Sequence, residues 1–267
     1  MSLFVVGKYI ALTWRIFIAN LSSTMSFRLS FLFYLFGIFV YWGGQFFLWT
    51  IFFNQFPSVG GWTSKNLISV YSLFLFSLAT LDTFAGGVIG DLANIINSGN
   101  LDYYLAFPKP VLWHLAVSKS DVTSICTIIL SSFFFLYSDS ISFVRILMFL
   151  LASCFSMTLL FNFYVITQSL AFFLGGFNQG ASAVRHTLTI VSPYPFNVFP
   201  NGLKFILMTL IPSFFIVTLP AQLVDNFSIQ TLLMLFCVSM VSSFIANKIF
   251  KFGLRRYESG NMVNVRV

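Results

Sequence analysis

Long apolar runs are the feature that most constrains how this chain can fold. Several stretches of about 20 residues contain hardly any charged side chain, and each is long enough to cross a bilayer as a helix. The whole chain is 58% hydrophobic and 8% charged, with 37 phenylalanines among 267 residues. Soluble globular domains carry about 25% charged residues, so these charges are too few to cover a water-facing surface. We therefore expect an integral membrane protein.

The runs predict an all-α integral membrane protein with six transmembrane helices. The first, second and sixth runs are the clearest, and the fourth is longer than one crossing needs. The fifth carries Pro212 and stops at Pro220, which predicts a kink or a break. The six spans are expected at residues 31–53, 67–88, 120–137, 143–174, 203–219 and 229–250.

The distribution of basic residues predicts that both termini are cytoplasmic. With the N-terminus inside, 12 of the 14 Lys and Arg residues fall in inner segments, and only Lys65 and Arg145 fall outside. This asymmetry supports both the span count and the orientation with both termini inside. It divides the chain into an inner N-terminal segment (1–30), a six-helix domain (31–250) with inner loops at 90–110 and 175–202, and an inner tail (251–267).

Residues 3–21 predict a helix with a narrow polar face, on which Lys8 and Arg15 lie opposite Trp14 and other apolar side chains. This pattern is typical of an amphipathic helix in the inner membrane interface, with its cations facing lipid headgroups. A seventh span is the alternative. It is disfavoured because Lys8 and Arg15 would be costly at its centre.

The net charge of +7 does not indicate nucleic acid as a partner, because the cations are spread over membrane-flanking segments instead of one soluble face. Anionic lipid headgroups explain the surplus more simply. The three cysteines lie in apolar runs without CxxC or Cys/His spacing, so we expect no metal or redox site. They are Cys126, Cys154 and Cys237.

Residues 90–110, GDLANIINSGNLDYYLAFPKP, form a polar island between two apolar runs. Asp91 is placed to cap a short helix, and Gly99 to end it in the left-handed conformation. Three apolar residues at i, i+3 and i+4 spacing then share one face: Leu92, Ile95 and Ile96. The pattern favours a short inner helix that docks on a partner. An ordinary interhelical loop is the alternative.

Three stretches resemble the type-2 ABC exporter permeases, and they occur in the order of that family. The run INSGNLDYYLAFPKP resembles the family's cytoplasmic loop. Residues 194–222 resemble its fifth-span region, with a Tyr-Pro start and a mid-span Ile-Pro. Residues 252–260 resemble its closing Gly-Leu-x-x-Tyr-x-Ser. In the loop, the matching residues are Ile96, Gly99, Leu101, Asp102, Leu105 and Pro108.

The resemblance implies a transmembrane permease subunit that pairs with a second, identical or related permease subunit in the bacterial cytoplasmic membrane. Two cytoplasmic ATP-binding subunits would bind beneath the pair and hold the ATP and Mg²⁺, so this chain would need no cofactor. The loop after the second span would be the coupling helix; Asn100 stands where many relatives carry Glu. Candidate ATPase contacts are Asp91, Leu92, Ile95, Ile96, Gly99, Leu101 and Asp102.

The sequence contains no Gly-x-x-x-x-Gly-Lys-Ser/Thr and no Gly-x-Ser-x-Gly, so we expect a non-catalytic subunit. Asp82, the only acid well inside an expected span, lies near the inner end, where snorkelling or helix packing is favoured over a proton relay. His114 and His186 have no acid arranged around them. The glycine pairs at 43–44 and 86–87 allow either close helix approach or a looser helix.

The expected function is export by alternating access, driven by a separate ATPase. Few charges in the spans favour a lipophilic or amphipathic cargo. One alternative is a secondary carrier or channel that needs no nucleotide. Such proteins typically have charged residues at the membrane midplane or broken helices at matched positions, and in this sequence only Asp82 and Pro212 fit that description. A membrane scaffold that transports nothing is the other.

Overall fold

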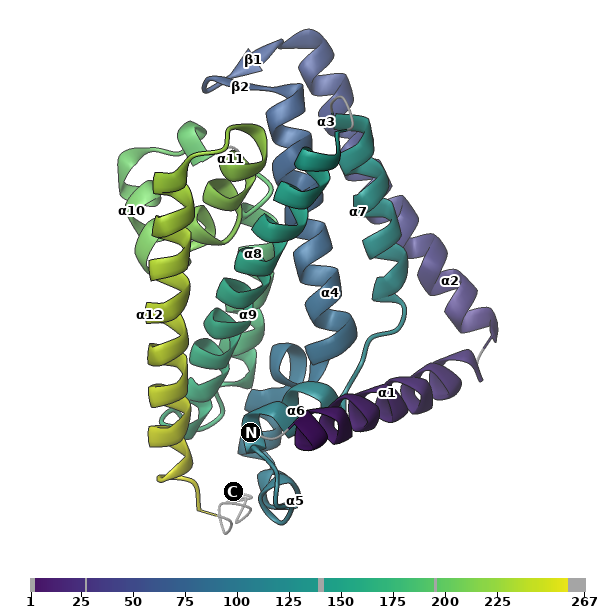
Figure 1. Ribbon diagram of the computed structural model, residues 1–267, viewed down its shortest axis with the longest axis vertical. Helices are drawn as coiled ribbons and strands as arrows, with labels where there is room; N and C mark the ends of the chain where they lie inside the picture. The colour runs from purple at the N-terminus through teal and green to yellow at the C-terminus, as the bar shows by residue number, and fades with distance from the viewer. Residues whose placement is uncertain (1–2, 27, 139–141, 195, 259–267) are drawn as a thin grey trace, which may run out of the picture.

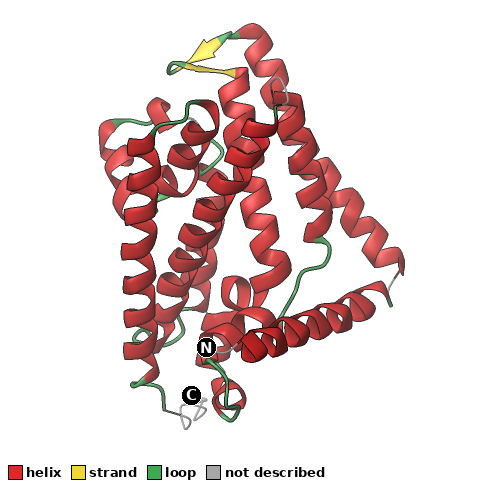
Figure 2. Ribbon diagram, in the orientation of Figure 1, coloured by secondary structure: helices red, strands yellow, loops and turns green. Residues whose placement is uncertain are grey.

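The computed structural model describes residues 3–26, 28–138, 142–194 and 196–258, with side chains from residue 11 onward, and these residues are almost entirely helical (Figures 1 and 2). The one sheet is a hairpin of two two-residue strands. The elements are α1 (Leu3–Met25), α2 (Arg28–Ile38), η1 (Phe39–Gly43), α3 (Gly44–Gln55), β1 (Ser58–Val59), β2 (Trp62–Thr63), α4 (Ser64–Asn97), α5 (Leu101–Leu105), α6 (Val111–Ser118), α7 (Ser124–Ser138), α8 (Phe143–Ser169), η2 (Leu170–Phe172), α9 (Asn178–Val191), η3 (Phe196–Val198), α10 (Asn201–Thr209), η4 (Phe214–Thr218), α11 (Leu219–Asp225) and α12 (Ile229–Leu254).

The predicted all-α membrane fold is confirmed, whereas the six-span count stays a prediction. Among the described residues, four helical stretches are long and apolar enough to cross a membrane: Arg28–Gln55, Ser64–Asn97, Phe143–Phe172 and Ile229–Leu254. The helices on either side of Pro212 would make a fifth if they form one bent span, and α7 is apolar but only 15 residues long.

The bundle has two distinct ends (Figure 1). One end, called the α5 end below, holds α1, α5, α6 and the C-terminal end of α12; the other, the hairpin end, holds β1, β2, α10 and α11. The N-terminal segment is helical, as predicted, and lies across the bundle. Phe17 of α1 is buried against Phe84, with ring centroids 5.8 Å apart, while Trp14 is exposed. Side-chain placement of Lys8 lies outside the described residues.

Helix α4 is the centre of the bundle, and it is kinked at Ala85, where φ is −136° and ψ is 24°. Its side chains pack on α6, α7 and α8. At the kink the Asp82 carbonyl accepts a hydrogen bond from the backbone N–H of Asp121, 3.0 Å away. A buried carbonyl without a partner would cost free energy, so this bond repairs the interruption.

The glycines beside the kink allow α6 to approach closely. A Cβ on Gly87 would lie 1.9 Å from the carbonyl oxygen of Leu115. At Gly43 and Gly44 no atom lies within 4 Å of a built Cβ. The open choice between close approach and loosening is therefore resolved as close approach at residues 86–87.

Gln168 of α8 joins α8 to the lower half of α4. Its buried side-chain amide donates to the carbonyl of Ile89 (2.9 Å) and accepts from the N–H of Ala93 (3.0 Å). These two backbone groups are four residues apart, so they are the pair that an α-helix joins directly. A side chain placed on this pair fixes both the position and the rotation of α4 against α8.

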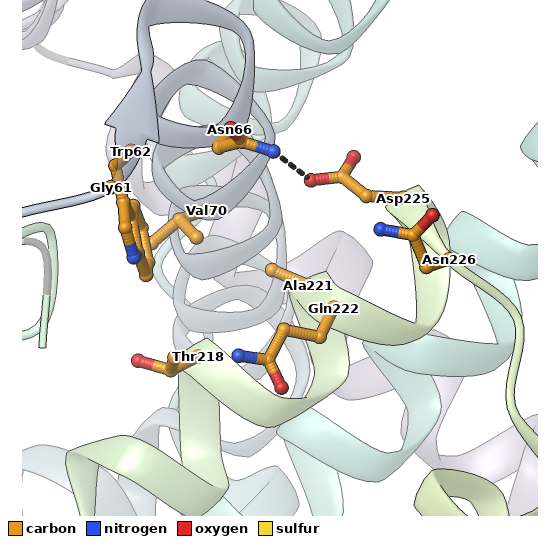
Figure 3. Close-up of a pocket in the computed structure, with 9 residues that line it drawn as sticks. All are labelled: Gly61, Trp62, Asn66, Val70, Thr218, Ala221, Gln222, Asp225 and Asn226. Carbon is orange, nitrogen blue, oxygen red and sulfur yellow. Dashed lines mark hydrogen bonds between the residues drawn. The ribbon is translucent and has the colours of Figure 1, made fainter. Parts of the chain in front are cut away.

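The hairpin end is closed by a polar network around Arg145. Its guanidinium donates to the hydroxyls of Ser138 (2.9 Å) and Ser69 (3.3 Å), and lies 3.9 Å from the carboxylate of Asp225. Asn66 donates to the same carboxylate at 3.0 Å. Figure 3 shows Asn66 and Asp225 facing each other beside a polar pocket of about 140 Å³. The network joins the ends of α4, α7, α8 and α11.

Residues 175–202 differ from the predicted inner loop because they contain α9 and η3. Asn178, the first residue of α9, accepts a hydrogen bond from the side chain of Asn97, the last residue of α4. Beyond α9, Asn197 donates to the carbonyl of Gly60 in the hairpin turn, at 3.3 Å. The segment therefore runs from the α5 end to the hairpin end.

The fifth apolar run is broken, as predicted, but its far boundary was wrong. The helices before and after Pro212 are bent by 73°. The chain does not stop at Pro220, which stands in the first turn of α11, where a proline is tolerated, and the helix continues to Asp225. Because residue 197 and residue 225 both contact the hairpin end, the broken pair begins and ends on the same side.

Gly87→Ala should destabilise the protein because the new methyl group would overlap the Leu115 carbonyl. We expect a loss of about 1–3 kcal/mol, the usual cost of overpacking, measured as a lower midpoint of thermal unfolding in detergent. Gly44→Ala is the matched control and should be neutral or slightly stabilising. Equal behaviour of the two variants would contradict the close α4–α6 approach.

Candidate interaction site at the α5 end

The polar island does not begin a new helix at Asp91. Instead, α4 continues through this residue to Asn97, so the predicted helix start is wrong. The Asp91 carboxylate pairs with Lys119 on the loop before α7 and caps nothing. The helix end is confirmed: Gly99 has φ +74°, the left-handed conformation that glycine adopts without strain.

The predicted apolar face exists, but it turns inward. Leu92, Ile95 and Ile96 are 0%, 7% and 6% exposed and belong to the core of the chain itself. Leu101 is also buried, whereas Asp102 is exposed and Asp91 and Gly99 are half-buried. Periodicity identified a shared face correctly, but could not tell a partner from the neighbouring helices of the same chain.

The exposed apolar side chains of this end lie on α5 and the turn after it. Tyr103 is 62% exposed, Leu105 40% and Phe107 37%. Figure 1 shows α5 projecting beyond α6 at this end. Sequence analysis did not single out Tyr103 or Phe107 as contacts. The available signal was an aromatic-rich run, LDYYLAF, placed between two polar turns instead of inside a span.

A ring cluster attaches α5 to α6. The buried His114 of α6 lies among Tyr103, Tyr104 and Phe107, with ring centroids 6.2, 5.1 and 5.1 Å away. The Tyr104 hydroxyl is also hydrogen-bonded to Ser118 at 3.2 Å. Burial lowers the pKa of His114, and the positive charge of Lys109 lowers it further. The neutral ring is therefore the form that the cluster accommodates.

The C-terminal tail holds the turn between α4 and α5. The Tyr257 hydroxyl donates to the carbonyl of Gly99 at 2.8 Å. Burial raises the pKa of Tyr257, and the nearby Asp102 carboxylate adds to the shift. Gly253 leaves room for the ring of Phe172, whose Cδ2 would lie 2.3 Å from a built Cβ. The loop and tail stretches that resemble the permease family thus meet in space, although residues 259–260 lie outside the described part.

A second polar contact lies within the bundle. Arg185 of α9 donates to the Asp82 carboxylate of α4 at 2.9 Å; the Asp82 side chain is 16% exposed and that of Arg185 35%. The expected packing role of Asp82 therefore takes the form of an ion pair between helices. Within residues 3–26, 28–138, 142–194 and 196–258, no three His, Cys, Asp or Glu side chains gather in a way that could hold a metal ion.

Comparison with known proteins agrees with this architecture. A family model described as "ABC-2 family transporter protein" matches residues 39–260, from η1 to beyond α12. No curated protein and no solved structure matches the chain.

Acid pH should loosen α5 from α6. The His114 pKa lies below its ordinary value in the folded protein, so unfolding of this cluster takes up a proton as pH falls below about 6.5. The stability contributed by neutral His114 is thus complete above that pH and declines below it. Hydrogen exchange of residues 101–110, corrected for intrinsic rates, should rise between pH 7.5 and 5.5, by at most about tenfold per pH unit.

Replacement of His114 by Phe should abolish this pH response. Replacement of the exposed His186 by Gln is the control and should leave the response unchanged. An equal response in the His114 variant would show that the ring cluster does not depend on the neutral imidazole.

Proposed function

The chain belongs to the ABC-2 transporter family, and on that premise we propose that it is the permease subunit of an exporter driven by a separate ATP-binding subunit. ATP and Mg²⁺ would be bound by that subunit, and this chain would carry out no chemical reaction. This chain and its ATP-binding subunit would work at the bacterial cytoplasmic membrane together with a second permease subunit, identical or related.

Six crossings follow if α9 is the fifth. The crossings would be the four long apolar stretches α2–α3, α4, α8 and α12, the shorter apolar helix α7, and α9, which has 14 residues and a polar face. The broken pair α10 with η4–α11 would enter and leave on the hairpin side. Arg185 then lies within the membrane, neutralised by Asp82, and Lys204 moves to the hairpin side. The α5 side keeps ten of the 14 basic residues against three on the hairpin side, so we place both termini and α5 in the cytoplasm.

The exposed face of α9 is the observation that carries the proposal. Four polar side chains at helical spacing are exposed along this helix: Gln179, Ser182, His186 and Thr187. A crossing helix does not turn such a face toward lipid, where polar groups find no hydrogen-bond partner. We infer that it faces the second permease subunit and a water-filled path between the two.

Movement at α5 would be transmitted by the contacts already described. The ring cluster attaches α5 to α6, and α6 lies directly against α4 at Gly87. Gln168 then fixes α4 to α8, and the Asp82–Arg185 pair fixes it to α9. A displacement of α5 by the ATPase would therefore move α4, α8 and α9 together, as alternating access requires.

The helix α1 would lie in the inner membrane interface, in contact with lipid headgroups. It lies across the bundle at the α5 end, and the exposed Trp14 is the type of side chain found at headgroup level. Since the proposed crossings contain few charges, the cargo would be lipophilic or amphipathic.

If the exposed apolar side chains of α5 and the turn after it contact the ATP-binding subunit, charged substitutions there should weaken its binding. Tyr103→Asp, Leu105→Asp and Phe107→Asp, tested singly and together, should reduce co-purification of the ATP-binding subunit at least about tenfold, because an interface core tolerates no unpaired charge. Phe56→Asp makes the same change at an exposed residue of the hairpin end and is the matched control.

Normal ATPase capture by the triple variant would contradict the assignment of α5 as the contact. Transport by the purified chain without any ATPase would instead favour a secondary carrier, for which the buried Asp82–Arg185 pair would be the coupling site.

A further inference from the structure

A polar cavity lies inside the otherwise apolar bundle, between α2, α4, α7 and α9. It has a volume of about 200 Å³, and its walls include Asp82, Asp121 and Arg185, together with the rings of Tyr34 and Trp42. Charged groups at this depth are costly and indicate a functional site when they surround a cavity.

The charges of the cavity do not balance. Arg185 is paired with Asp82. The carboxylate of Asp121 accepts hydrogen bonds only from neutral groups: the Thr123 N–H (3.0 Å) and hydroxyl, and the Ser124 hydroxyl (3.0 Å). No Lys, Arg or His of the described residues lies within ion-pair distance of it. Two carboxylates and one guanidinium leave one negative charge, which a cationic guest would neutralise.

The aromatic walls favour the same guest. Tyr34 of α2 and Trp42 of η1 both line the cavity. Aromatic faces attract ammonium groups, most strongly where water is excluded, and do so without requiring an N–H donor from the guest. A quaternary ammonium group therefore suits both the charge and the surface of this cavity.

A second cavity, of about 500 Å³, lies beside this site at the corner between α1 and α2. It shares Tyr34 and Asp121 with the polar cavity, and its outer wall includes Thr24 and Ser30 on the two sides of that corner. Since α1 is proposed to lie at the inner headgroup level, a guest could enter here from the inner leaflet with its polar end leading.

An apolar groove of about 860 Å³ lies beside the polar cavity, along α2, η1 and α3 against α7. It shares Ile38 with the polar cavity, and its walls include Phe39, Ile129 and Phe133. Gly43 and Gly44 lie in it without a side chain to fill the space. This volume is within the range of about 300–1,000 Å³ typical of small-molecule sites.

We propose that the three spaces form one binding site for a cationic amphiphile, with its ammonium headgroup beside Asp121 and its hydrocarbon chain in the groove. The proposal names the cargo class of the exporter proposed above and rests on that function only for transport, because binding itself needs no ATPase. An anionic amphiphile would meet the unpaired charge of Asp121, and a small cation would leave the groove empty.

Binding of radiolabelled dodecyltrimethylammonium to the full chain in zwitterionic nanodiscs tests the site, with empty nanodiscs as the background. We expect saturable binding, displaced by unlabelled probe. Dodecyl sulfate, with the same chain, and tetramethylammonium, with the same headgroup, should each compete at least about tenfold less well. Equal competition by dodecyl sulfate, or no saturable binding, would overturn the proposal.

Variants separate the headgroup site from the groove. Asp121→Asn removes the charge, keeps one oxygen that accepts from Thr123 and places an amide N–H donor beside the Ser124 hydroxyl, and should weaken binding at least about tenfold. Glu258→Gln removes one charge from the exposed tail and should not. Ile129→Trp fills the groove and should weaken binding, whereas Leu233→Trp on the exposed face of α12 should not. Unchanged binding in either cavity variant would overturn the site.

The binding site and the proposed exporter function can fail independently. Saturable binding that does not change ATP hydrolysis by the assembled complex would support the site and contradict the proposed function. Normal ATP-driven export of this probe by the Asp121→Asn variant would overturn the site and leave the function in place.

Discussion

The bilayer offers no hydrogen bonds, and this constraint decides how α4 is held. At three places along α4, a polar group of this helix is bonded by another part of the chain. The backbone N–H of Asp121 donates to the carbonyl at the kink. The side-chain amide of Gln168 is hydrogen-bonded to the backbone of Ile89 and Ala93, and Arg185 neutralises the Asp82 carboxylate. Each partner comes from a different segment of the chain. The bonds that satisfy the polar groups of α4 therefore also position the segments around it.

The two ends of the bundle are held by different kinds of contact. The hairpin end is locked by Arg145, whose side chain joins several helix ends through hydroxyl and carboxylate oxygens. The α5 end is held by ring contacts, by hydrogen bonds from Tyr104 and Tyr257 and by the Asp91–Lys119 pair, and it exposes apolar side chains on α5. This difference fits the proposal that a partner protein binds at the α5 end and moves the bundle, while the hairpin end stays rigid.

Composition and run length were sufficient to predict an all-α membrane fold, the left-handed Gly99 and the break at Pro212. They did not identify residues 178–191 as a helix that packs on α4. In a count of basic residues Arg185 is taken as a cytoplasmic cation, and its pairing with Asp82, 103 residues away, is seen only in the structure. They also could not show that the face of Leu92 turns inward, since helical periodicity is the same for a core face and a docking face.

The most direct test of the account is the side of the membrane on which Asn201 lies. Charge counting alone places this residue in the cytoplasm, whereas a crossing by α9 places it outside. In a variant without Cys126, Cys154 and Cys237, Asn201→Cys should react with a membrane-impermeant maleimide in intact cells, and Asn100→Cys should react only after permeabilisation. Labelling of Asn201→Cys only after permeabilisation would contradict the crossing and the transmission path built on it.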